Sequence, residues 1–403
     1  MFDKWTIKKK WLLFPVFFFL YLLAIFDLNI PIFGPASIFL VISVSMFFLN
    51  DHIRTFKSKY FFQLLIILYV ACAFVVFRSV NTNIDYILIF FKVVIVIMTS
   101  FLLTLFIIKK YTIDYFLAVF FLVLTLQSIS PWFFISFEPY REVVSSLQYY
   151  DPIRNFETRG VMAIRKSFIS GSGGYFGMAI GLGLGLIIST WFFVLEKINK
   201  YKFFVFFILL SVAAILAGRT AIMFVFFALL VLFFNLNFIK KITLAMIFFI
   251  ACFIFWFSID FLYSISNEYK VLGWALEPVM NYYSDGTVES ESTSILMDMF
   301  YLPDVKTFLL GDGLYYSKTG GYYGGVDVGY LRQVLFGGVL IVIFSVFYLF
   351  YALSNGSKWI VLSIAIPLML AHFKGVVLLS TPTAMSLLSS FSAYLYYKKY
   401  NKG

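Results

Sequence analysis

The chain has 403 residues, of which 62% are hydrophobic, and its mean hydropathy is +0.94. This composition excludes a soluble globular protein, because it leaves too little polar surface to face water on every side. The net charge of +11 does not indicate a nucleic-acid partner, because most of the excess is lysine that we place at a membrane surface, where anionic lipids attract it.

Apolar runs near 20 residues in length recur along the whole chain, and such a run can cross the roughly 30 Å of hydrocarbon in a bilayer as a helix. We predict an all-α polytopic membrane protein with about twelve transmembrane helices and a single membrane domain spanning 1–403. The first run is longer than a signal-peptide core and lacks a cleavage site, so it counts as a span. The runs cover residues 11–29, 31–50, 61–77, 86–108, 114–130, 172–195, 203–218, 220–236, 242–259, 328–353, 359–373 and 376–397.

Lysine clusters precede the first run and follow nearly every even-numbered run, up to Lys398 and Lys399 at the end of the chain. Basic residues hold short loops in the cytoplasm, so both termini are predicted to be cytoplasmic. In this topology seven of the eight arginines lie on the opposite, outer side. A planar, permanently charged fork that binds phosphate is a physical reason to place arginines there.

Two predicted outer segments, about 131–171 and 260–327, are too long to be simple connectors, and long loops usually carry function. The second holds ten of the twenty carboxylates. Both are rich in Tyr, Gly and Ser, as sugar-binding surfaces often are, although tyrosines also suit any membrane interface.

Glycines recur every fourth residue at the start of the sixth run, at Gly173, Gly177, Gly181 and Gly185. One helical face of glycines lets a neighbouring helix approach closely. Alternatively, the loop 170–174 presents backbone amides to a phosphate.

Arg219 lies between the apolar stretches 203–218 and 221–234. Sixteen helical residues reach only about 24 Å, so this hairpin is expected to turn slightly below the outer surface, near the depth of lipid phosphates. An arginine at that depth is a functional-site candidate, and the alternative is that it extends to lipid headgroups.

A cluster in the first outer segment comprises Arg154, Arg159 and Arg165, beside Lys166. It suits an anionic ligand, or else it is a solvated loop paired with nearby carboxylates. Arg159 and Arg165 are favoured as ligands because they lie nearest the glycine-rich entry to the sixth run.

Asp327 and Arg332 stand at the start of the tenth run, and His372 and Lys374 lie where the eleventh run reaches the outer face. Asp327 is a candidate base for a sugar hydroxyl, or an N-cap of the following helix. A lone buried histidine is more often structural, whereas Lys374 has apolar neighbours on both sides and is harder to explain without a ligand.

At these positions the chain resembles the O-antigen polymerase family, which shares a fold with O-antigen ligases. Three segments of the C-terminal half carry the resemblance, and a fourth at 372–374 is also similar. The N-terminal half is similar only in topology and in its arginine-bearing loop. The three segments are Leu216-Ala217-Gly218-Arg219-Thr220-Ala221, Leu309-Leu310-Gly311-Asp312-Gly313, and Asp327-Val328-Gly329-Tyr330-Leu331-Arg332 running into Phe336-Gly337-Gly338-Val339.

The resemblance implies a GT-C-like, inverting glycosyltransferase in the bacterial inner membrane, with its active site facing the periplasm. Such enzymes move a growing glycan from undecaprenyl diphosphate onto a lipid-linked repeat unit, without cofactor or metal, beside membrane lipids and in some systems a chain-length regulator and a flippase. By motif position the catalytic residues are Asp327 and Arg219. The predicted diphosphate ligands are Arg219, Arg159, Arg165, Arg154, Arg332 and Lys374.

This sequence departs from the ligases in two ways. A histidine that ligases carry near the start of the span after the large loop is replaced here by Asp327, which favours a polymerase. The large loop also lacks the ligase arginine and offers only Lys270, Lys306 and Lys318, which leaves the second diphosphate ligand open.

Three alternatives stay open at the level of sequence. The protein is a ligase that transfers glycan to a lipid A core, or a flippase or transporter for lipid-linked oligosaccharide, or a purely structural membrane protein. Transporters often have internal repeats and mid-span charges, and here only Lys92 is mid-span.

Cys72 and Cys252 lie inside runs and are expected to be packing residues, and no zinc, Walker or dinucleotide motif is present.

Overall fold

The computed structural model describes residues 13–30, 34–35, 59–79, 84–148, 165, 167–170, 176–196, 198–259, 261, 263–264, 270–287, 290–317 and 321–400. In this part of the chain the regular elements are helices and one antiparallel pair of two-residue strands, β1 (Asn29–Ile30) and β2 (Gly34–Pro35), joined by loops and turns. Each predicted run other than 31–50 contains a helix, and most of 31–50 lies outside the described residues.

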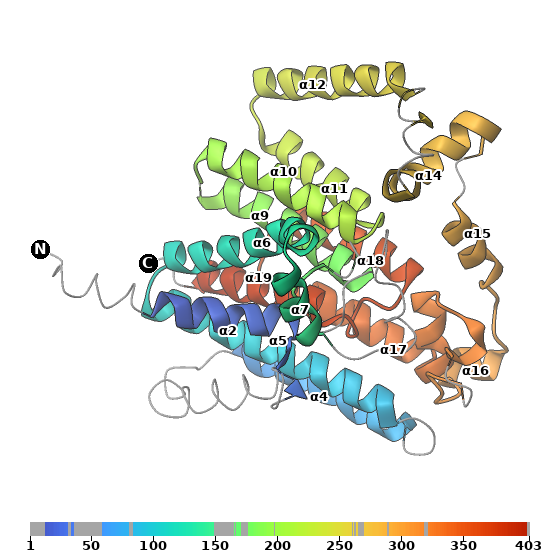
Figure 1. Ribbon diagram of the computed structural model, residues 1–403. Helices are drawn as coiled ribbons and strands as arrows, with labels where there is room; N and C mark the ends of the chain where they lie inside the picture. Colours follow the sequence, from blue (N-terminus) through green and yellow to red (C-terminus); the bar gives the residue numbers. More distant parts are fainter. Residues whose placement is uncertain are drawn as a thin grey trace, which may run out of the picture.

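The helices follow the apolar runs closely, with α6 extending six residues beyond its predicted end (Figure 1). Their bounds are α2 Phe14–Phe26, α4 Lys59–Ser79, α5 Ile84–Lys110, α6 Ile113–Ser136, α7 Glu138–Ser146, α9 Phe176–Glu196, α10 Lys200–Ala217, α11 Ala221–Asn235, α12 Phe238–Phe257, α14 Lys270–Asp285, α15 Glu291–Asp298, α16 Val305–Leu310, α17 Gly329–Leu353, α18 Lys358–Lys374 and α19 Pro382–Tyr400, with a short 3₁₀ turn η2 at Tyr323–Gly325.

By length and composition, five helices in the described part of the chain can cross a membrane: the stretch Tyr86–Lys110 of α5, and α6, α9, α10 and α17. Shorter apolar helices, α2, α11 and the part of α4 from Gln63 to Arg78, lie beside them. The protein is therefore a helical membrane protein, and the total of twelve spans stays a prediction.

Polar side chains set where several of these helices begin. The hydroxyl of Thr112 accepts a hydrogen bond from the Tyr115 amide at the start of α6. Asn199 accepts from two amides at the start of α10, and Ser357 accepts from the Ile360 amide at the start of α18. Such caps satisfy amides that have no partner within the helix.

α9 is the central helix, with most of its side chains buried against α10, α11 and α19. Close packing explains its glycines. A Cβ atom at Gly181 would lie 3.0 Å from the Cβ of Thr383, and one at Gly183 would lie 2.7 Å from the Phe224 side chain. The helix-packing interpretation therefore accounts for Gly181, whereas Gly173 and the loop 171–174 lie outside the described residues.

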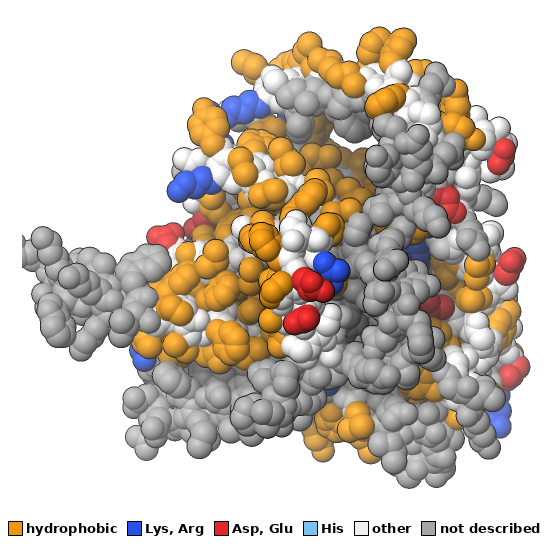
Figure 2. All heavy atoms as spheres, in the orientation of Figure 1, with side chains coloured by type: hydrophobic (Ala, Val, Ile, Leu, Met, Phe, Trp, Pro, Cys, Tyr) orange, Lys and Arg blue, Asp and Glu red, His pale blue; other side chains and the backbone are white. Residues whose placement is uncertain are grey.

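The surface of the bundle is strongly apolar. Figure 2 shows hydrophobic side chains over most of the described surface of α2, α6, α10 and α11. Phenylalanines such as Phe204 and Phe226 are exposed there, as expected for contact with lipid. The C-terminal end of α19 lies at one end of the bundle, and α14, α15 and α16 gather at the opposite end (Figure 1).

Candidate functional site

A cavity of about 560 Å³ lies where the α10–α11 turn, α14, α15, the start of α17, the end of α18 and α5 come together. Every predicted site residue within the described part of the chain lines it: Arg165, Arg219, Asp327, Arg332 and Lys374. The other two predicted ligands, Arg154 and Arg159, fall outside the described residues. Residues separated by more than 200 positions in the sequence thus share one cavity.

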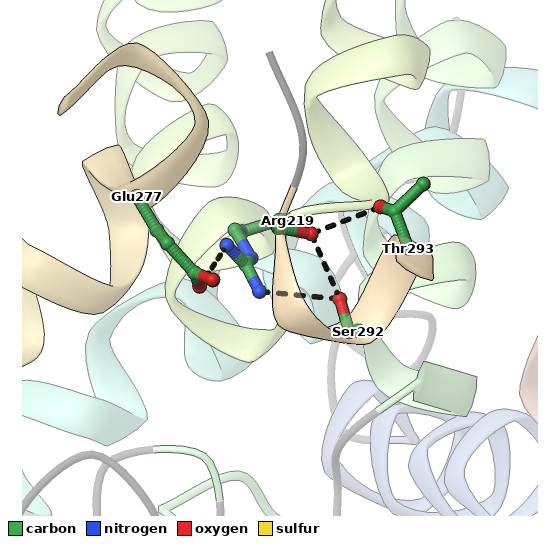
Figure 3. A network of polar contacts seen from close by, with 5 residues as sticks. Arg219, Glu277, Ser292 and Thr293 are labelled. Carbon is green, nitrogen blue, oxygen red and sulfur yellow. Dashed lines mark hydrogen bonds and ion pairs between the residues drawn. The ribbon is translucent and has the colours of Figure 1, made fainter. Parts of the chain in front are cut away.

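Arg219 occupies a tight turn between two apolar helices. α10 ends at Ala217, and the Ala221 amide at the start of α11 donates to the Gly218 carbonyl at 2.9 Å. The Arg219 side chain extends toward Glu277 of α14 and Ser292 of α15, as Figure 3 shows. Its Nη1 atom is 2.6 Å from the Glu277 carboxylate on α14, and its Nη2 atom donates to the Ser292 hydroxyl on α15 at 3.3 Å.

Trp274 lies one helical turn before Glu277 and brings a second arginine to the same place. The Arg165 and Arg219 guanidinium carbons are 5.1 and 5.2 Å from the centre of a Trp274 ring, within the usual range of a cation–π contact. Arg165 also donates from Nε to the Ala217 carbonyl at 3.2 Å. The partly buried Lys374 lies within the electrostatic influence of both arginines, so three cations converge here.

Arg332 and Asp327 form a second charged group in the cavity. Arg332 Nη1 is 3.0 Å from Asp327 Oδ1, and the side chains are 7% and 50% exposed respectively. The guanidinium carbon lies 4.3 Å from the centre of the Tyr315 ring and 3.5 Å from that of Tyr322. Burial raises the pKa of Tyr315, outweighing the nearby Arg332 charge, which lowers it. The ion pair with the buried Arg332 thus holds the more exposed Asp327 carboxylate at the cavity.

The N-cap interpretation of Asp327 is wrong. The capping residue of α17 is Val328, and no side chain caps this helix end. The Asp327 carboxylate is instead directed to Arg332, four residues into the helix from Val328. The carboxylate thus lies at the cavity without a role in starting the helix.

The second and third motif segments dock onto each other. α17 departs from helical geometry at Gly337 and Gly338, so carbonyls just before the break lose their helical partners. The Asp312 amide donates to the Leu335 carbonyl at 2.7 Å, and the Gly313 amide donates to the Phe336 carbonyl at 2.9 Å. The segment 309–313 therefore completes the broken helix.

Glycine is required at this contact. Gly311 has φ +68°, and a Cβ atom there would lie 2.5 Å from the Gly338 nitrogen. Arg78, in the last turn of α4, donates to the Gly311 carbonyl. Together these contacts fix the start of α17, and hence Asp327 and Arg332, relative to the bundle.

Asp312, the carboxylate of the second motif segment, is engaged within its own loop. Its carboxylate accepts from the Thr307 hydroxyl at 2.8 Å and from the Tyr323 phenol at 3.3 Å, and it does not line the cavity. Burial first, and the Asp312 charge second, raise the pKa of Tyr323, so the phenol stays neutral and keeps donating. Asp312 therefore holds the loop together.

His372 is structural, as a lone buried histidine is expected to be. Its Nδ1 atom accepts from the Val377 and Leu378 amides at 2.9 and 3.2 Å, and its Nε2 atom is 3.1 Å from the Gln333 amide oxygen. With Nδ1 as acceptor, we assign the proton to Nε2. This network joins α18 to α17 and positions Lys374 at the cavity.

The sequence did not reveal every residue of the cavity. Lys92 of α5 forms an ion pair with the buried Asp27, which follows α2 with φ +48°, and both line the cavity. Lys92 was identified as a mid-span charge, but nothing in the sequence indicated its partner. Trp274 and Tyr322 also had no distinguishing signal, because neither lies in a recognisable motif.

The cavity carries an excess of positive charge. Among the described residues that line it are the cations Lys92, Arg165, Arg219, Arg332 and Lys374 and the carboxylates Asp27 and Asp327. Glu277 adds a third carboxylate through its pair with Arg219. Five cations against three carboxylates leave two positive charges for an anion to neutralise.

A metal site has no support among the described residues, which contain no group of three or more His, Cys, Asp or Glu side chains able to hold an ion. Comparisons with protein-family models, with curated proteins and with solved structures found no match to this chain.

Proposed function

We propose that the protein is an inverting glycosyltransferase that polymerises lipid-linked oligosaccharide repeat units from a polyprenyl-diphosphate donor. The observation that carries this proposal is the convergence of Arg165, Arg219 and Lys374 beside Asp327 and Arg332 in one cavity. A diphosphate esterified at both ends carries two negative charges, which suits a cavity whose lining carries an excess of positive charge. The family resemblance supplies the identity of the donor as undecaprenyl diphosphate.

In the proposed reaction, an acceptor sugar hydroxyl attacks the anomeric carbon of the donor glycan. The bond between that carbon and the diphosphate oxygen breaks, with inversion, and undecaprenyl diphosphate leaves with the bonding electron pair. Guanidinium groups fixed in a partly dry cavity stabilise the charge that accumulates on the leaving group. Arg219, Arg165 and Lys374 have this role.

Asp327 is the proposed base, which accepts the proton of the attacking hydroxyl. Its 50% exposed side chain can reach a substrate in the cavity, whereas the Asp312 carboxylate is engaged outside the cavity. Arg332 is assigned to positioning Asp327 rather than to the donor, because it is buried between two tyrosine rings. The diphosphate is already an activated leaving group, so no further energy source is needed.

We also propose the topology that this reaction requires. Twelve spans place both termini in the cytoplasm and the segments 131–171 and 260–327 in the periplasm of a bacterial inner membrane. Two observations support this arrangement: the lysine distribution along the chain, and the position of α14–α16 at the opposite end of the bundle from the C-terminal end of α19 (Figure 1).

The direct test is polymer formation by the purified protein from a single defined undecaprenyl-diphosphate-linked repeat unit. A ladder of products, each longer by one repeat, is expected on a gel. Transfer only to an added lipid A core would identify a ligase instead. Movement of the substrate across the bilayer of a proteoliposome, without a new glycosidic bond, would identify a flippase.

A further inference from the structure

Arg219 already holds two oxygen atoms in the arrangement that a phosphate would supply. One is the Glu277 carboxylate oxygen at 2.6 Å from Nη1, and the other is the Ser292 hydroxyl at 3.3 Å from Nη2 (Figure 3). A guanidinium fork binds a phosphate through two parallel N–H···O bonds of this kind. We propose that Glu277 occupies the place of a donor phosphate oxygen on Arg219, and that the donor binds by displacing it.

The Glu277 carboxylate, which would compete with a phosphate for Arg219, belongs to α14 and not to the α10–α11 turn that carries Arg219. Trp274 and Glu277 lie three residues apart on α14, so they share one face of that helix. Trp274 and Ser292 line the cavity, and Arg219 is only 13% exposed while paired with the 25% exposed Glu277. Because Nη1 and Nη2 already contact Glu277 and Ser292, a ligand that binds through both nitrogens takes the position of Glu277.

The hydroxyl side of the fork is weakly held. Ser292 belongs to a chain of hydroxyl groups, in which Ser290 Oγ is 3.1 Å from Ser292 Oγ and 2.9 Å from Thr293 Oγ1. These groups can bond to one another once Arg219 is occupied by a ligand. A single carboxylate oxygen and a neutral hydroxyl together bind an arginine less strongly than a bidentate, doubly charged diphosphate does, so displacement is favourable.

This inference rests on the proposed function only for the identity of the anion. The occupied fork reduces the fraction of protein that is ready to bind, and the apparent dissociation constant rises in inverse proportion to that fraction. Removing the competing charge while keeping the shape of the side chain should therefore tighten binding of any diphosphate. Glu277→Gln is that change.

The experiment measures binding of geranylgeranyl diphosphate to the full-length protein in phosphatidylcholine nanodiscs. Glu277→Gln is expected to lower the dissociation constant about three- to tenfold. The matched control is Glu142→Gln, which changes the net charge equally at an exposed position on α7 that does not line the cavity. In the control the dissociation constant should equal that of the wild type.

An unchanged or higher dissociation constant in a folded Glu277→Gln protein would overturn the displacement. Should that variant fail to fold, Glu277→Asp retracts the carboxylate by one methylene and should give a smaller gain in affinity; no gain would again overturn it. Binding that tightens in a protein that makes no polymer would support the displacement and reject the proposed function. Absence of diphosphate binding in all variants and the wild type would reject both.

Discussion

Replacing Arg219 with alanine removes the guanidinium group on which the proposed donor site depends. In the structure this group contacts Glu277 at 2.6 Å and Ser292 at 3.3 Å and lies against the Trp274 ring. In the proposed reaction the same guanidinium group stabilises the charge that develops on the leaving diphosphate. Loss of one such preorganised donor group typically lowers the rate about 10²–10³-fold, or roughly 3–4 kcal/mol of transition-state stabilisation.

The effect of this substitution on folding should be small by comparison. The Glu277 side chain loses its Arg219 partner, but it is 25% exposed, so water can solvate the carboxylate. Partly exposed ion pairs contribute on the order of 1 kcal/mol or less. The purified variant should therefore insert normally and unfold within a few degrees of the wild type, which separates lost chemistry from lost structure.

The assay is polymer formation from the defined lipid-linked repeat unit, with Arg219→Lys and Arg141→Ala measured alongside. The lysine variant keeps the charge but loses the fork, so it should recover only a minor part of the activity. Arg141 is exposed on α7 and does not line the cavity, so its removal should leave the polymer unchanged.

One result would refute the reasoning about Arg219. A residue that serves only to hold α14 through the Glu277 pair would be equally sensitive to loss of either partner. Arg219→Ala and Glu277→Gln would then reduce polymer to the same extent. We expect them to differ, with Arg219→Ala far more damaging.

Three further predictions concern the base, the motif contact and the topology. Asp327→Asn should lower polymer formation about 10²-fold or more with unchanged donor affinity and no response to EDTA; a full ladder would exclude Asp327 as the base, and metal-restored activity after chelation would exclude the metal-free reaction. Gly311→Ala should lower the thermal unfolding midpoint, because a non-glycine residue at φ +68° costs about 1–2 kcal/mol before any clash; an unchanged midpoint would argue against the docking contact. In a cysteine-free background, exposed cysteines at Ser145 and Ser284 should react with an impermeant reagent from the periplasmic side, and one at Ser354 should not; the reverse pattern would invert the topology.

The positions of the helices could be predicted from the sequence, because a helix that crosses hydrocarbon must be apolar along its length, whichever helices it packs against. Long apolar runs such as 86–108 and 114–130 coincide with α5 and α6. A charged residue within apolar sequence could also be recognised from its neighbours alone. An arginine between two apolar helices, as at 219, is energetically costly unless it has a partner. That reasoning selected five residues that line one cavity.

Only the tertiary structure decided which groups meet in that cavity. Arg219 and Glu277 are 58 residues apart, and the Lys92–Asp27 pair joins α5 to the end of α2. No local pattern specifies such pairs, because they depend on how the helices pack. For the same reason Asp327 is directed to Arg332 rather than to its own helix end: the buried guanidinium offers it a charged partner, which binds a carboxylate more strongly than neutral backbone amides do.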